Sequence, residues 1–140
     1  MQTQRIRGMA TANYWADDVP AAAAWYSEVL GIEPYFAQPA PPATAAYVEF
    51  RIGDHQAELG IVDRRYQPQP AGGPGGVILY WAVDDVQEAH DRLLSLGATP
   101  YQPVTARGDG GFITAAVLDP FGNVFGVMEN PHYLEMLTRS

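Results

Sequence analysis

The chain has 140 residues, of which 47% are hydrophobic, and a formal net charge of −8 at pH 7. This length fits one domain, and the hydrophobic fraction is sufficient for a core. Because the chain contains no cysteine, disulfides, zinc fingers and thiol catalysis are excluded, and because all eight basic residues are arginine, so is a lysine Schiff base. The negative charge argues against nucleic acid and anionic membranes as partners.

The sequence shows no membrane-spanning or secretory segment. No hydrophobic run approaches the roughly 20 residues that a transmembrane helix needs. The segment Met1–Arg7 contains no apolar signal region, so export is not indicated. We therefore expect the protein to work in the cytoplasm and without a membrane partner.

The first half of the chain predicts a strand, a helix, a short strand and a β-hairpin. Asp18 and Pro20 favour the start of the helix, and Gly31 favours its end. Ala22, Trp25 and Val29 recur at helical spacing and should face a sheet. The predicted elements are residues 8–16 (strand), 21–30 (helix), 32–36 (strand), and 47–52 and 56–62 (hairpin).

The second half predicts the same order of elements. Asp85 and Glu88 have the spacing of a helix capping box. The segment Asp119–Asn123 combines Asp, Pro, Gly and Asn, which is typical of a tight turn, and hydrophobic runs flank it. The predicted elements are residues 77–83 (strand), a helix from 85 to 96, 99–104 (strand), 112–118 and 124–128 (hairpin), and a short helix within 131–140.

The two halves form an internal repeat. Gly60 lies 66 residues before Gly126 within matching hydrophobic runs, and Asp18 lies 67 residues before Asp85. A twofold repeat of this length predicts a pseudo-twofold α+β domain made of two βαβββ modules, whose concave sheets enclose a cleft. The predicted single domain comprises a first module (8–62), a linker (63–76), a second module (77–130) and a C-terminal tail (131–140).

This pattern resembles the vicinal oxygen chelate superfamily, which includes glyoxalases, bleomycin-resistance proteins and extradiol dioxygenases. The resemblance spans about residues 8–130. The matching segments are Asp18 with Trp25-Tyr26, Val29-Leu-Gly-Ile32, Val83-Asp-Asp-Val86 with Leu96-Gly97, and Asp119-Pro-Phe-Gly-Asn123. The resemblance implies the glyoxalase/bleomycin resistance/dioxygenase fold.

The resemblance also implies where a metal ion would be held, on the first and last strands of each module. The matching positions here are Thr11, Gly60, Ile78 and Gly126. These side chains offer no His nitrogen or carboxylate oxygen, so we expect no metal and no other cofactor. Glu58, on the same strand face as Gly60, is the one nearby acid and a weak candidate for a general base.

Alternation along the strands predicts which side chains line the cleft. The set combines aromatic rings with a few polar groups, as small-molecule sites do, although the same rings would also fill a closed core. The predicted ligand-binding residues are Asn13, Trp15, Tyr47, Glu49, Arg51, Glu58, Tyr80 and Ile113, with Ala115 beside Ile113. We expect exposed or structural roles for His55, His90 and His132, because none of them pairs at ligand spacing.

Two functions of different class remain open. The first is a bleomycin-resistance-like protein, as in antibiotic resistance, that binds a small aromatic or cationic organic molecule without a metal. The second is an enzyme of the glyoxalase, epimerase or dioxygenase type with a degenerate site. A ligand outside any resistance role would also fit. The resemblance further implies a homodimer, and the apolar residues Tyr133, Leu134 and Leu137 of the tail agree with one.

Overall fold

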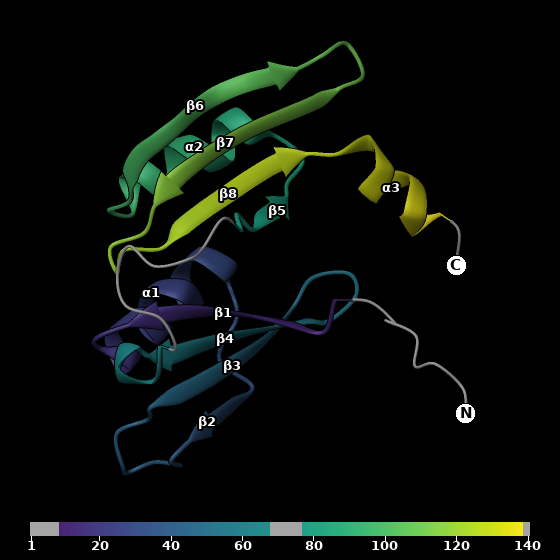
Figure 1. Cartoon of the computed structure of the whole chain (residues 1–140). Helices are drawn as coiled ribbons and strands as arrows, with labels where there is room; N and C mark the ends of the chain where they lie inside the picture. Colours follow the sequence, from purple (N-terminus) through teal and green to yellow (C-terminus); the bar gives the residue numbers. More distant parts are fainter. Residues whose placement is uncertain (1–8, 68–76, 139–140) are drawn as a thin grey trace, which may run out of the picture. The chain divides into compact units, whose positions relative to one another are not determined.

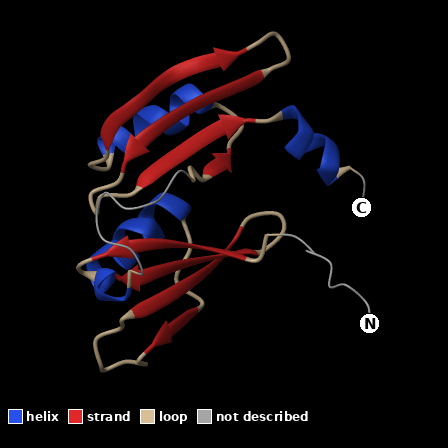
Figure 2. Cartoon of the chain, in the orientation of Figure 1, coloured by secondary structure: helices blue, strands red, loops and turns tan. Residues whose placement is uncertain are grey.

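The computed structural model describes residues 9–67 and 77–138, and within these the chain forms two compact units. The first unit ends at Gln67 and the second follows it. Each unit is a four-stranded mixed sheet with a helix against one face (Figures 1 and 2). The predicted α+β fold with two βαβββ modules is therefore confirmed.

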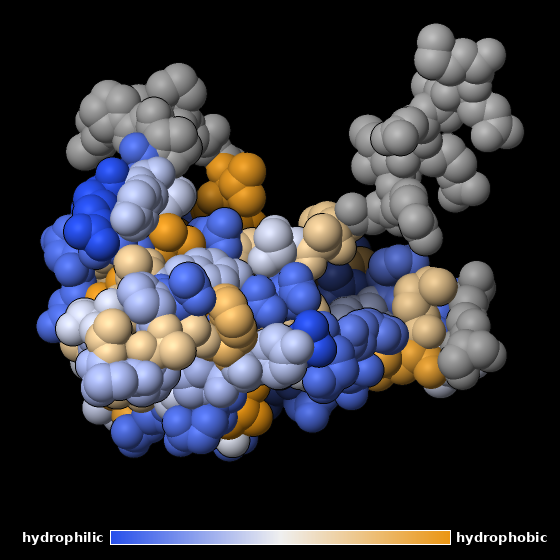
Figure 3. Space-filling view, turned by 90° about the horizontal axis from the view of Figure 1, so that it is seen from below, coloured by the Kyte–Doolittle hydropathy of each residue, from blue (hydrophilic) through white to orange (hydrophobic). Residues whose placement is uncertain are grey.

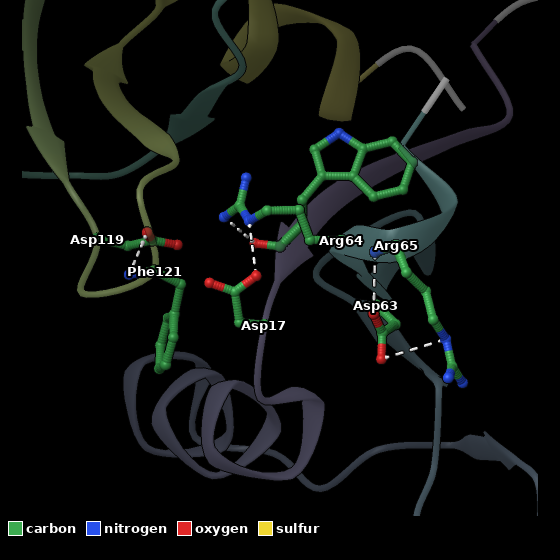
Figure 4. Close-up of polar contacts among 7 residues, drawn as sticks. Asp17, Asp63, Arg64, Arg65, Asp119 and Phe121 are labelled. Atoms are coloured by element: carbon green, nitrogen blue, oxygen red, sulfur yellow. Dashed lines mark hydrogen bonds and ion pairs between the residues drawn. The ribbon is translucent and has the colours of Figure 1, made fainter. Parts of the chain in front are cut away.

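In the first unit, the sheet has the strand order β1-β4-β3-β2. β1 runs parallel to β4, whereas the two remaining pairs are antiparallel. The elements are β1 (Thr11–Ala16), α1 (Val19–Leu30), β2 (Phe36–Gln38), β3 (Tyr47–Ile52), β4 (Ala57–Asp63) and a short 3-10 turn, η1 (Arg64–Tyr66). Arg64 ties the ends of β4 and β1 together, since its guanidinium pairs with Asp17 at 3.2 Å and donates to the Trp15 carbonyl at 3.4 Å (Figure 4).

The second unit repeats this arrangement in the strand order β5-β8-β7-β6, with β5 parallel to β8. An additional helix, α3, follows the last strand, as predicted for the tail. The elements are β5 (Tyr80–Ala82), α2 (Val86–Ser95), β6 (Thr99–Arg107), β7 (Phe112–Leu118), β8 (Val124–Glu129) and α3 (Pro131–Leu137).

Several predicted strand bounds need correction, including the strand predicted over 77–83, which is confined to Tyr80–Ala82. The second strand begins at Phe36 and not at residue 32, because Pro34 has no N–H and pairing starts only with the Tyr35 N–H, which donates to the Glu49 carbonyl at 2.7 Å. β6 continues to Arg107, through residues predicted as a loop. It is an edge strand with irregular register, so its two prolines are tolerated there.

The predicted helix caps are confirmed. The Asp18 carboxylate accepts from the Ala21 N–H and the Asp85 carboxylate from the Glu88 N–H, both at 3.1 Å. Gly31 ends α1 in the left-handed conformation, with φ of 72°. Glu129 of β8 supplies a further cap for α2, because its carboxylate accepts from the Val86 N–H at 3.0 Å.

The core of the first unit forms where α1 covers its sheet. Tyr26 is fully buried and stacks on Tyr14 of β1, with ring centroids 5.4 Å apart. Trp25, which we predicted to face the sheet, is only half-buried and lies edge-on against Tyr26. The helix is rotated so that Ala22 and Tyr26, four residues apart, form its buried face.

The turn at residues 119–123 depends on one buried carboxylate. Asp119 is 4% exposed and accepts from the Phe121 N–H at 2.9 Å (Figure 4). It also accepts from the Asn123 N–H at 2.8 Å. The Asn123 side-chain amide donates a third bond at 2.9 Å. These bonds satisfy the carboxylate and confirm the predicted turn.

Hydrophilic residues prevail on the face of the molecule seen in Figure 3, and the hydrophobic residues there form separate small groups. Large exposed hydrophobic side chains in the described ranges include Tyr35, Phe36, Tyr66, Tyr101 and Leu134. No extended apolar patch is visible on this face, and the homodimer stays a prediction. No helix within residues 9–67 and 77–138 has the length and hydrophobicity that crossing a bilayer requires.

Replacement of Tyr26 by Ala should lower the free energy of unfolding by about 3–5 kcal/mol, because it removes a fully buried ring and leaves a cavity against Tyr14. Trp25→Ala on the same helix turn is the matched control, and its effect should be clearly smaller because Trp25 is half-buried. Chemical denaturation measures both values. Equal losses for the two variants would contradict the observed rotation of α1.

Candidate functional site

The first sheet has one face free of its helix, which we call the helix-free face of the first sheet. The register places Asn13 and Glu49 beside Gly60, and Trp15 and Tyr47 beside Val62. Adjacent partners share a face, so the predicted residues of this unit lie together. They are Asn13, Trp15, Tyr47, Glu49, Arg51 and Glu58. Whether they contact a ligand stays a prediction.

Phe36 also belongs to this face, although the sequence analysis did not select it. It pairs with Glu49 in the register of β2 and β3, and its ring centroid lies 6.4 Å from that of Tyr47. It was missed because β2 was predicted too early and ended at Phe36. The strand pattern alone contains no other signal that identifies it.

Gly60 provides the space that the Tyr47 ring occupies. A side-chain Cβ at Gly60 would lie 2.6 Å from Tyr47 Cε1 and would also collide with Asn13 Oδ1. The aromatic ring therefore lies against β4, at the position where any other residue would place its side chain. The Tyr47 hydroxyl donates to Glu49 Oε1 at 2.8 Å, which fixes the direction of the ring.

One of the carboxylates on this face is paired with an arginine. Arg51 pairs with Glu58, with a nitrogen to oxygen distance of 3.6 Å, and its guanidinium carbon lies 3.8 Å from the ring centroid of Tyr35. Both members of the pair remain partly exposed, so the pair contributes little to folding stability. With Glu49 included, the face carries two carboxylates and one guanidinium.

The environment of Tyr47 favours its neutral form. Burial, followed by the hydrogen bond to Glu49 and the negative charges of Glu49 and Glu58, raises the pKa of Tyr47 to about 12. At neutral pH the phenol is therefore a hydrogen-bond donor and not a base. The face therefore presents an uncharged aromatic ring beside a carboxylate.

The second sheet repeats the arrangement of a tyrosine over a glycine. A Cβ at Gly126 would lie 2.6 Å from Tyr80 Cδ1, and Tyr80 and Gly126 are register partners. The Tyr80 hydroxyl donates to Gln102 Oε1 at 3.1 Å and so crosses β8 and β7 to the edge strand β6. Tyr80, a predicted ligand-binding residue, thus shares a face with Gly126, and Gln102 is an addition that the sequence did not indicate.

Ile113 and Ala115 do not share the face of Gly126, and that prediction is wrong. Ala116 is the partner of Gly126, whereas Ile113 pairs with Glu129, whose carboxylate caps α2 on the helix-bearing side. The two hairpin turns differ in length, and this difference is the cause. Four residues separate the paired Ile52 and Ala57, but three separate Asp119 and Asn123, whose backbones are bonded at 2.8 Å. Applying the repeat spacing of 66 residues to β7, the strand before the second turn, therefore assigns its side chains to the wrong face of the sheet.

The side chains at the positions implied for a metal do not suit one. Thr11 and Gly60 stand on β1 and β4, and Ile78 and Gly126 are their counterparts in the second unit. Hydroxyl, alkyl and hydrogen side chains are not the donors that transition metals prefer. Within the described ranges, no group of three His, Cys, Asp or Glu side chains could hold a metal ion.

The histidines lie apart from these faces. His55 and His132 are exposed, as expected. The side chain of His90, on α2, is only 12% exposed, and neither ring nitrogen has a hydrogen-bond partner among the described residues. The expectation of an exposed His90 is therefore wrong.

A protein-family model described as Glyoxalase/Bleomycin resistance protein/Dioxygenase superfamily matches residues 8–127. A glyoxalase-related enzyme from Fulvimarina pelagi is similar in structure, with a TM-score of 0.67, 22% identity and 90% of each chain covered. TioX from Micromonospora sp. ML1 has a TM-score of 0.63 and 19% identity over 87% of this chain and 98% of its own.

A lactoylglutathione lyase from Agrobacterium tumefaciens has a TM-score of 0.64 and 24% identity, over 92% of this chain and 98% of its own. These similarities show the fold, because identities below 25% do not carry a specific activity. No curated protein sequence matches the chain significantly.

Gly60→Ala should destabilise the protein by about 1–3 kcal/mol, because the new methyl group displaces the Tyr47 ring and the Asn13 side chain. Gly110→Ala is the matched control, since its Cβ would meet Phe112 carbons at an ordinary 3.6 Å. Combining Gly60→Ala with Tyr47→Ala should cost less than the sum of the two single changes. Strict additivity in denaturation experiments would show that the two residues do not compete for this space.

Tyr47 should remain mainly neutral at pH 11, because its pKa is about 12, while tyrosines without such neighbours ionise near 10. Carbon-13 NMR of the tyrosine rings measures this, with Tyr47→Phe identifying the signal. Glu49→Gln should lower the pKa but leave it above 10, since burial is the largest cause. Between pH 10 and 12, the unfolded chain loses the proton of the Tyr47 hydroxyl, whereas the folded chain keeps it. The contribution of this group to folding stability is therefore complete below pH 10 and is lost as the pH rises toward 12. A Tyr47 midpoint near 10 would contradict the structure.

Proposed function

Because the chain belongs to the Glyoxalase/Bleomycin resistance protein/Dioxygenase superfamily, we propose that it binds a small organic molecule with an aromatic or cationic part, without a metal ion. The proposed contact surface is the helix-free face of the first sheet. The binding residues proposed on this face are Asn13, Trp15, Tyr47, Glu49, Arg51 and Glu58.

The observation that carries this proposal is the Tyr47 ring at Gly60. At the position where the family resemblance implies a metal ligand, this chain has no side chain, and an oriented aromatic ring fills the space. Aromatic faces with a few placed polar groups are suited to flat organic molecules. Glu49, hydrogen-bonded to Tyr47, adds a carboxylate that attracts a cation.

The alternative is an enzyme, as the names of the glyoxalase-related enzyme and the lactoylglutathione lyase suggest. Glu58 is the candidate general base, but its carboxylate is already paired with Arg51 at 3.6 Å. Tyr47 is neutral at physiological pH. The binding function therefore has the stronger physical support. Capture of a drug, as in antibiotic resistance, is one use of such a binding site, and the site suits a drug as well as it suits another small molecule.

The proposed binding is tested by titrating the protein with planar aromatic compounds while its tryptophan fluorescence is recorded. The compounds are used in pairs, one cationic and one neutral. Tyr47→Ala should weaken binding about tenfold, since a stacked aromatic pair contributes about 0.5–1.5 kcal/mol beyond area burial. Glu49→Gln and Glu58→Gln should weaken binding of the cationic members only. Tyr66→Ala is the control, because Tyr66 lies on η1 beside Arg65 and outside the sheet.

Elemental analysis after dialysis against zinc, nickel or iron(II) should give well under one equivalent of metal. Two results would overturn the proposal: a stoichiometric metal lost in Glu58→Gln, or binding that Tyr47→Ala and Tyr66→Ala alter to the same degree. Saturable binding that only Tyr47→Ala weakens supports it.

A further inference from the structure

The helix-free face of the second sheet, which carries Tyr80 and Gly126, differs from that of the first sheet in charge. The only acidic residue on strands β5 to β8 is Glu129, and its carboxylate caps α2 on the opposite face. The only basic residue on these strands is Arg107, at the end of β6. Among the strand residues described, this face therefore carries one positive charge and no negative charge.

Arg107 is held on this face by a buried threonine. It pairs in register with Phe112, and Thr114, two residues further along β7, lies diagonally across from it. Long side chains reach such diagonal neighbours. Arg107 Nε donates to Thr114 Oγ1 at 3.0 Å, and Thr114 is 7% exposed. The stem of the guanidinium is thereby fixed, and its two terminal nitrogens make no hydrogen bond to residues within 9–67 and 77–138.

Arg107 also differs from other arginines of the chain. Arg51, Arg64 and Arg65 each pair with a carboxylate, at 3.6, 3.2 and 3.6 Å respectively. Arg107 makes no ion pair with a residue of the described ranges. Acidic residues are abundant in this chain, whose net charge is −8. The Arg107 guanidinium nevertheless contacts a neutral hydroxyl group, that of Thr114.

We propose that Arg107 forms an anion-binding site on the second sheet, which accepts the carboxylate of a small aromatic acid. The two terminal guanidinium nitrogens match the two oxygens of a carboxylate. Phe112, the register partner of Arg107 on the same face, offers an aromatic surface beside it for the body of the ligand. This site goes beyond the proposed function, because it lies on the other sheet and recognises the opposite charge.

Benzoate is a suitable probe, with benzamide as its neutral counterpart of the same shape. Titrating the full chain with benzoate should shift the Arg107 Nε–Hε signal in nitrogen-15 NMR spectra in a saturable manner. Arg107→Gln should weaken benzoate binding about tenfold or more, since a hydrogen bond to a charged group contributes about 1.5–3 kcal/mol. Thr114→Val, which removes the acceptor that orients the guanidinium, should weaken it by a smaller factor.

Arg65→Gln is the matched control, because it removes one positive charge from an exposed arginine of the first unit and should leave benzoate binding unchanged. Benzamide should not shift the Arg107 Nε–Hε signal. Equal losses in Arg65→Gln and Arg107→Gln, or equal shifts of this signal by benzamide and benzoate, would overturn the proposal. Inorganic phosphate is titrated in parallel, and tighter binding of phosphate than of benzoate would overturn the carboxylate assignment. Tyr47→Ala should leave the benzoate response intact, so this result is separate from that of the proposed function.

Discussion

The close approach of a tyrosine ring to a glycine organises the helix-free face of each sheet. Tyr47 lies over Gly60 in the first unit and Tyr80 over Gly126 in the second, at distances that no Cβ would permit. Because adjacent strands share their alternation, one such contact fixes which side chains accompany the ring. The hydroxyl groups then extend to acceptors on their own sheets, Glu49 and Gln102.

The duplicated architecture carries different chemistry in its two halves. The first sheet presents carboxylates of which one is paired with Arg51, and the second presents the guanidinium of Arg107 without an acidic partner in the described residues. A shared fold therefore does not give the two faces a shared ligand preference. Each face is defined by a few side chains at positions that the strands make equivalent.

The helices and strands were largely predictable because their signals are local. Hydrophobic periodicity, the caps at Asp18 and Asp85, and the turn at Asp119 depend on residues within a few positions of one another. Most residues of the helix-free face of the first sheet could be predicted from the alternation of side chains along single strands. Phe36 and Gln102 were not predicted, because their places depend on where an edge strand begins and on a bulged register.

The sequence by itself determined the repeat, the order of elements and the matching positions of Gly60 and Gly126, since these depend only on residue type and position along the chain. Tertiary structure decided the rotation of α1 toward Tyr26 and the strand face of Ile113. When the turn is shorter by one residue, every side chain of the preceding strand lies on the opposite face of the sheet, although the hydrophobic pattern of that strand hardly changes. Only the hydrogen-bonded register between neighbouring strands distinguishes the two faces, and that register forms when the sheet assembles.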